Sequence, residues 1–235
     1  ELKGVYSDLE ITRILESRMI FGMYPEIIMA ADNAGDRLRN IAMSYLFKDV
    51  LQYRNIKNPE VLNKLLSALA LQIGNEVSYN ELAEIAGVDK KTASNYIQVL
   101  EKTFVIFRLS PFSRNLRNEL KKMRKIYFYD TGIRNALINN FNSLDLRTDK
   151  GALWENFMIS ERVKYNNNRG KAKNIYFWRT HAQKEIDYVE EYEGKLEGYE
   201  FKWGKDSFTK PKDFLETYKN STIELINRNN FQKFV

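Results

Sequence analysis

The sequence has no cysteine and a single histidine among its 235 residues. The missing cysteines exclude disulfides, thiolate nucleophiles and zinc sites with Cys ligands, and one histidine cannot supply a two-histidine metal site within one chain. Serine–histidine–aspartate catalysis would depend on His181, which we interpret as a solvated loop residue. With 11 glycines, 4 prolines and 43% hydrophobic residues, the composition is that of a globular protein with one large or two modest domains.

Long hydrophobic segments and nucleotide motifs are also missing. No apolar run reaches the roughly 18 residues of a membrane span, and the polar start Glu1-Leu2-Lys3 is unlike a secretory signal. We therefore expect a soluble, cytoplasmic protein that does not enter a membrane. No phosphate loop of the form GxxxxGKS or GxxxxGKT occurs, so the chain as given has no such route to binding ATP.

The positive charge is concentrated in one stretch. The whole chain carries 37 basic and 31 acidic residues, a net charge of +6, and residues 111–150 contribute +5 of this with nine basic and four acidic side chains. Most of these basic residues are Arg114, Arg117, Lys121, Lys122, Arg124 and Lys125. Such a stretch is typical of a surface that contacts phosphates, and a solvated loop or a surface facing an ATPase module is the alternative.

Residues 58–140 begin with signals for three helices. Asn58 and Pro59 are typical of a helix cap and its first position, and apolar residues then recur at helical spacing up to Gly74. Ser78 with Glu81 predicts a capping box that opens a second helix ending at Gly87, and Asp89 predicts the cap of a third.

Strand-like runs at 104–109 and 125–129 follow these helices, and the combination predicts a winged helix-turn-helix over residues 58–140. Polar residues at the start of the third helix would meet base edges and phosphates if the unit binds DNA. A winged helix can instead bind a protein partner, and the sequence leaves both possibilities open. The candidate nucleic-acid-binding residues are Lys90, Lys91, Thr92, Ser94, Asn95, Arg114, Arg117, Lys121 and Lys122.

Residues 139–150 are rich in Asn, Asp and Ser and predict a loop before a second unit, residues 146–235. A helix is expected from about 151 to 165, ending at the run Asn166-Asn167-Asn168. Strands are expected at 174–179, 185–192, 196–203 and 222–226, with a helix at 212–219 before the last strand. The predicted order is therefore α-β-β-β-α-β.

Two of these strands carry candidate catalytic residues, Asp187, Glu200 and Lys202. Glu200 and Lys202 are two residues apart, so they project from the same strand face, and a hairpin would bring Asp187 alongside. Asp187, Glu200 and the helix residue Glu155 are candidate ligands of Mg²⁺, which needs one or two carboxylates with water and phosphate oxygens. Lys202 would then orient water or stabilise the transition state of phosphodiester hydrolysis. The alternative is that these charges lie on a solvated hairpin.

Several separated motifs resemble one protein family. They are Gly22-Met23-Tyr24-Pro25-Glu26, Tyr45-Leu46-Phe47-Lys48-Asp49-Val50, Leu109-Ser110-Pro111-Phe112-Ser113-Arg114-Asn115, Lys125-Ile126-Tyr127-Phe128-Tyr129-Asp130-Thr131-Gly132, and Phe177-Trp178-Arg179-Thr180 with Glu185-Ile186-Asp187. In this order they resemble the C-terminal part of a prokaryotic family of AAA-type ATPases, in which a winged helix and a C-terminal domain of unknown function follow the ATPase module.

The resemblance implies that residues 1–57 are the helical lid end of the ATPase module, and that residues 146–235 resemble the PD-(D/E)XK nucleases. It places Asp187, Glu200 and Lys202 at the nuclease motif positions and Glu155 at the helix acid. ATP would bind only in the parent protein, so the missing N-terminal ATPase module is an expected partner and the chain is expected to be a fragment.

We therefore expect an α/β (α+β) chain comprising a helical lid remnant, a winged helix-turn-helix and a restriction-endonuclease-like unit. The leading hypothesis is the C-terminal part of an AAA-type ATP-binding protein whose winged helix binds DNA or a partner. One alternative is an active Mg²⁺-dependent DNA endonuclease, and another is a protein-interaction module without catalysis.

Overall fold

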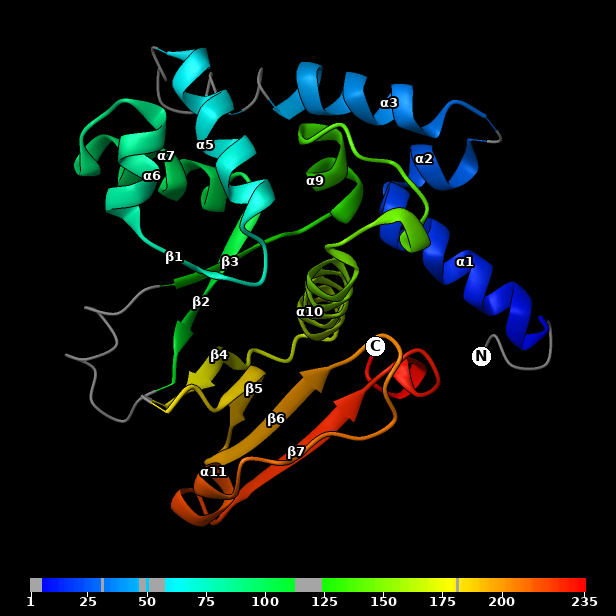
Figure 1. Cartoon of the computed structure of the whole chain (residues 1–235), viewed down its shortest axis with the longest axis vertical. Coiled ribbons are helices and arrows are strands. Elements are labelled where there is room, and N and C mark those ends of the chain that lie inside the picture. The colour runs from blue at the N-terminus through cyan, green and yellow to red at the C-terminus, as the bar shows by residue number, and fades with distance from the viewer. Residues whose placement is uncertain (1–5, 31, 47–49, 51–57, 113–123, 181) are drawn as a thin grey trace.

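A computed structural model describes residues 6–30, 32–46, 50, 58–112, 124–180 and 182–235. These residues form a seven-stranded sheet in the order β1-β3-β2-β4-β5-β6-β7, with helices along its length (Figure 1). The strands are β1 (Glu76–Val77), β2 (Ile106–Pro111), β3 (Arg124–Phe128), β4 (Asn174–Arg179), β5 (Glu185–Tyr192), β6 (Lys195–Phe201) and β7 (Ser221–Ile226). The α+β class expected from the sequence is confirmed.

The helices of the first half are α1 (Asp8–Phe21), α2 (Pro25–Met29), α3 (Ala34–Ile41), the π-helical turn η1 (Ala42–Leu46), α5 (Pro59–Leu71), α6 (Tyr79–Ala86) and α7 (Lys90–Lys102). Those of the second half are α9 (Thr131–Leu137), the 3₁₀ turn η2 (Leu144–Leu146), α10 (Lys150–Asn168), α11 (Lys212–Thr217) and the 3₁₀ turn η3 (Phe231–Lys233). No helix in the described ranges is long and apolar enough to cross a membrane.

Local signals account for most helix starts. Asn58 caps α5 by accepting hydrogen bonds from the backbone N–H groups of Glu60 and Val61, and Asp89 caps α7 by accepting from Thr92, as expected. The expected capping box of Ser78 and Glu81 is wrong. Ser78 makes no side-chain cap to α6, and the Glu81 carboxylate instead accepts from the side chain of Gln72 at 3.5 Å.

The expected end of α10 at the three asparagines is also wrong, because the helix continues to Asn168. Asn166 is buried, and its side-chain amide donates to Glu190 Oε1 at 2.6 Å. This contact with β5 gives the asparagine a partner outside the helix, so that a residue often found in turns is accommodated inside a helix.

The sheet combines antiparallel and parallel pairs. Strands β1, β3 and β2 pair antiparallel, as do β4, β5 and β6, while β7 pairs parallel with β6. The two groups join where β2 lies parallel to β4 through the pairs Ser110–Tyr176 and Pro111–Phe177. On one side of the group β4 to β7, Trp178 of β4 and Ile186 of β5 pack with Phe214 of α11 in a small hydrophobic cluster. The larger core lies on the other side, where α10 packs.

The end of α1 is held by the turn that starts α9. Asp130 accepts from the backbone N–H of Met23 at 2.7 Å, and the amide of Asn135 donates to the carbonyl oxygens of Met19 and Ile20 at 3.3 and 2.8 Å. Thus the segment 130–135, whose first three residues belong to one of the family motifs, docks the N-terminal helices onto the rest of the molecule.

Candidate functional site

Asp187 lies where β5 and β6 separate. The last paired residues are Tyr188 and Tyr199, and beyond them Asp187 Oδ2 accepts a hydrogen bond from the backbone N–H of Phe201 at 3.0 Å. A β-bulge contributes to this geometry, because the single residue Phe177 of β4 lies opposite both Asp187 and Tyr188. Burial raises the pKa of Asp187, although the charge of Lys125 and the bond from Phe201 act in the opposite direction.

Glu200, near the end of β6, forms an ion pair with Lys202, which lies just after the strand, because β6 ends at Phe201 and not at residue 203 as expected. Lys202 Nζ lies 2.7 Å from Glu200 Oε1, as expected for side chains two residues apart. Burial and the nearby charge of Asp187 raise the pKa of Glu200. Glu200 Oε2 is buried without a hydrogen-bond partner, which is costly for a polar atom and makes it the open acceptor of this site.

A lysine from a distant strand lies among these acids. Lys125 of β3 is 3% exposed; its ammonium lies 3.3 Å from Glu155 Oε1, pairs with Glu185, and stands 5.6 Å from the centre of the Phe177 ring. Burial alone would lower the pKa of Lys125, but the charges of Glu155, Asp187 and Glu185 outweigh it, so the pKa is raised. The lysine is therefore charged and neutralises part of the acidic cluster.

Glu155 belongs to α10 and faces this lysine. Its Oε1 also accepts a hydrogen bond from the Tyr127 hydroxyl at 2.6 Å. Burial, followed by the charge of Asp187, raises the pKa of Glu155, although Lys125 and the Tyr127 hydroxyl oppose that shift. Both partners of this carboxylate come from β3, so a strand of the predicted winged helix contributes directly to the acidic site of α10 and β5.

The donor set fits an ammonium ion better than Mg²⁺. In the part of the chain that the structure describes, no three or more His, Asp or Glu side chains converge so that they could hold a metal ion. Each acid instead has a partner within the protein. Glu155 pairs with Lys125 and accepts a hydrogen bond from Tyr127, Asp187 accepts one from the Phe201 N–H, and Glu200 pairs with Lys202. Sequence reasoning missed Lys125 and Tyr127, because their contact with Glu155 depends on which strand lies beside α10, and it gave no role to Glu185, which pairs with Lys125.

The candidate nucleic-acid-binding residues at the start of α7 are arranged unequally. Lys90, Lys91 and Asn95 are exposed and Ser94 is half-buried, whereas the Thr92 hydroxyl donates to Asp89 Oδ2 at 2.7 Å and so belongs to the helix cap. Arg114, Arg117, Lys121 and Lys122 lie outside the described residues, as does His181.

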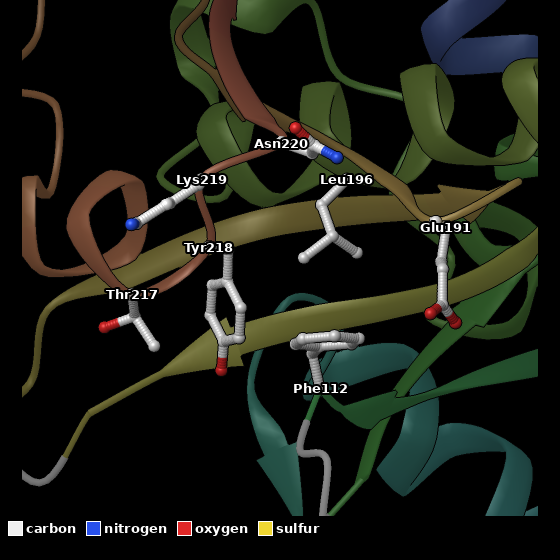
Figure 2. Close-up of a pocket in the computed structure, with 8 residues that line it drawn as sticks. Phe112, Glu191, Leu196, Thr217, Tyr218, Lys219 and Asn220 are labelled. Carbon is white, nitrogen blue, oxygen red and sulfur yellow. The ribbon is translucent and has the colours of Figure 1, made fainter.

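A surface cavity of about 610 Å³ lies between the β5–β6 hairpin and the segment that joins α11 to β7 (Figure 2). The rings of Phe112 and Tyr218 pack edge to face on its wall with their centroids 5.2 Å apart. Glu191 and Lys219 add a negative and a positive charge to the lining. Among the residues that the structure describes, no candidate site residue lines it. The cavity therefore adds no group to the acidic site.

Comparisons with known proteins give two families. Residues 12–144 match a family described as "Domain of unknown function (DUF8612)", and residues 150–231 match one described as "Domain of unknown function (DUF4143)". An uncharacterized protein of Mycobacterium tuberculosis is 28% identical over 162 residues, and one of Methanocaldococcus jannaschii is 25% identical over 172 residues. Each match covers 68% of this chain and 36% of the relative. No solved structure matches the chain.

Proposed function

This chain belongs to the family described as a domain of unknown function (DUF8612), and we propose that it is the C-terminal part of an AAA-type ATP-binding protein, in which residues 58–140 bind duplex DNA as a winged helix. Residues 146–235 are a PD-(D/E)XK-like unit that does not act as a nuclease while Lys125 occupies the acidic site. ATP and its hydrolysis belong to an ATPase module outside these residues, which is the natural partner of this chain.

The observation that carries the DNA proposal is the exposed start of α7. Helices α6 and α7 join through Gly87, whose φ of 70° gives the left-handed conformation of a tight turn, and β1, β3 and β2 form the antiparallel wing. This order of elements is that of a winged helix, whose second helix of the pair enters the major groove by its N-terminal residues. Lys90 and Lys91 stand there, where the helix dipole also favours phosphate.

Two observations support the place of the chain in a larger ATPase. The match covers about a third of the length of the uncharacterized relatives, and the separated motifs of the sequence resemble, in their order, those of AAA-type ATPases. Residues of two of these motifs make contacts that hold the fold together. Asp130 and its neighbours dock α1, and Lys125 with Tyr127 contacts Glu155.

The DNA proposal is tested by fluorescence anisotropy with a labelled duplex at increasing salt. We expect binding that weakens steeply with salt, and the double variant Lys90→Ala/Lys91→Ala should bind less tightly and lower the slope of log K against log salt by about 2. The control Lys64→Ala/Lys102→Ala removes the same charge from exposed sites away from the start of α7 and should bind like the original chain. Equal losses in both variants, or no salt-dependent binding, would favour the protein-interaction module instead.

A Mg²⁺-dependent endonuclease is the second candidate, favoured by the unpartnered Glu200 Oε2 beside Lys202. In that case Asp187 and Glu200 would hold the ion, Glu155 would assist, and Lys202 would stabilise the reacting phosphate. Supercoiled plasmid should then be nicked in the presence of Mg²⁺ and left intact by Asp187→Ala. Intact plasmid with the original chain would reject this candidate without affecting the DNA-binding proposal.

A further inference from the structure

The acidic site of residues 146–235 has two cations of its own, Lys202 beside Glu200 and Arg179 at 3.7 Å from Glu185, and its buried cation is supplied from outside that range. Lys125 comes from β3, which is three strands away from β5 in the sheet order. Its side chain passes the Phe177 ring and ends between Glu155 of α10 and Glu185 of β5. With 3% of its surface exposed, the lysine is shielded from water almost completely.

A buried ammonium ion in this position has a specific electrostatic role. Carboxylates taken out of water are stable only when opposite charge or hydrogen-bond donors replace the lost solvent. Lys125 supplies the charge, the Tyr127 hydroxyl donates to Glu155, and the Phe201 N–H donates to Asp187. A divalent cation bound at a group of acids would supply the same positive charge to the carboxylates.

We propose that the Lys125 ammonium is the resident cation of the site formed by Glu155, Asp187 and Glu185, and that it takes the place of a divalent metal ion there. This inference rests on the proposed PD-(D/E)XK-like arrangement, and it is independent of DNA binding. It also explains why β3 and α10 contact each other through charges as well as through apolar side chains. The acidic site is complete only when the strand of the first unit is in place.

The test is isothermal titration of the whole chain with Mn²⁺. The original chain should give no saturable binding at this site and no rise in melting temperature on adding Mn²⁺. Lys125→Met removes the charge but keeps an apolar side chain over Phe177. The carboxylates of Glu155 and Glu185, which do not converge on a metal position while they pair with Lys125, are then free to turn toward Asp187, so the variant should bind one Mn²⁺ per chain and regain stability with it. Adding Asp187→Asn to Lys125→Met should abolish that binding.

Lys173 provides a matched control. It also pairs with two acids, Glu190 and Glu197, at 2.6 and 2.9 Å and is mostly buried. Glu190 keeps further donors in Arg162 and Asn166 when Lys173 is removed. Lys173→Met should therefore be destabilised without gaining Mn²⁺ binding, and a gain like that of Lys125→Met would indicate a general charge effect and overturn the proposal.

Because Lys125→Met leaves an excess of buried negative charge, the double variant Lys125→Met/Glu185→Gln is a second test with the local charge balance preserved. It should fold and bind Mn²⁺ through Glu155 and Asp187. The proposal is overturned if either folded variant binds Mn²⁺ no better than the original chain, or if both stay unfolded with and without Mn²⁺. It is also overturned if the original chain itself binds Mn²⁺ in a manner abolished by Asp187→Asn, whereas DNA binding, measured separately, would be unaffected by these outcomes.

Discussion

The side chain of Asn156 makes the two hydrogen bonds to Phe128 that the backbone of a neighbouring strand would otherwise make. It lies in α10 with no exposed surface, and its Oδ1 accepts from the backbone N–H of Phe128 at 2.9 Å. Its Nδ2 donates to the carbonyl oxygen of the same residue at 2.8 Å. The side chain thus satisfies both backbone groups at the end of β3, and so helps to hold that strand, and Lys125 on it, against α10.

Replacing this amide should be costly. Asn156→Ala leaves the N–H and C=O of Phe128 buried without partners, and at about 1–3 kcal/mol for each group we expect a loss of roughly 2–6 kcal/mol in the free energy of unfolding. Denaturant unfolding measures this loss. Asn167→Ala, an exposed asparagine of the same helix, should change stability by no more than about 0.5 kcal/mol. A loss at Asn156 no larger than at Asn167 would show that water replaces the amide.

At this scale the sequence predicts what depends on near neighbours. The caps at Asn58 and Asp89 and the closeness of Glu200 to Lys202 follow from spacings of two or three residues and are present, whereas the capping box of Ser78 and Glu81, which has the same spacing, is not. The acidic site is different. Its ammonium ion, Lys125, is thirty residues from Glu155 in sequence, and a pattern of alternating residues cannot tell which distant strand will lie beside which helix.

Among the elements, the contact of α1 with α9 depends on the absence of a side chain. A Cβ at Gly132 would lie 2.2 Å from the carbonyl oxygen of Phe21, at the end of α1. The clash is with backbone, which cannot rotate away as a side chain can. Thr131 and Asn135 on either side donate to carbonyl oxygens of the same helix end. The glycine therefore allows the two helices to approach closely enough for these bonds.

Gly132→Ala should separate the two helices. We expect a loss of roughly 1–3 kcal/mol in the free energy of unfolding, as for other overpacked contacts, together with faster hydrogen exchange of the α1 amides. Gly151→Ala is the matched control, because a Cβ there meets nothing within 4 Å and the residue lies in α10, where alanine favours the helix by about 0.5–1 kcal/mol. Unchanged exchange in α1 after Gly132→Ala would contradict the role of this close approach.

For the whole molecule, continuity of the sheet and core is the main feature that local patterns do not predict. The helices and most strands were expected near their observed positions, but nothing in the sequence indicates that β2 would pair with β4 and join the strands into one sheet. The join is reinforced by the bond from the Phe112 N–H to the Phe177 carbonyl oxygen and by Lys125. The main hydrophobic cluster accordingly extends from Leu15 to Phe234.

Such continuity predicts one cooperative unfolding transition. All three tryptophans lie within residues 146–235: Trp154 in α10, Trp178 in β4 and Trp203 just after β6. Tryptophan fluorescence therefore reports on this part of the chain alone. Far-ultraviolet circular dichroism is dominated by helices, many of which precede α10. If the shared core and the Lys125 contacts bind the two halves together, both signals should change at the same denaturant concentration. Two separate midpoints would mean that the residues before α10 unfold independently, and that the Lys125 contacts and the β2–β4 pairing are too weak to couple them.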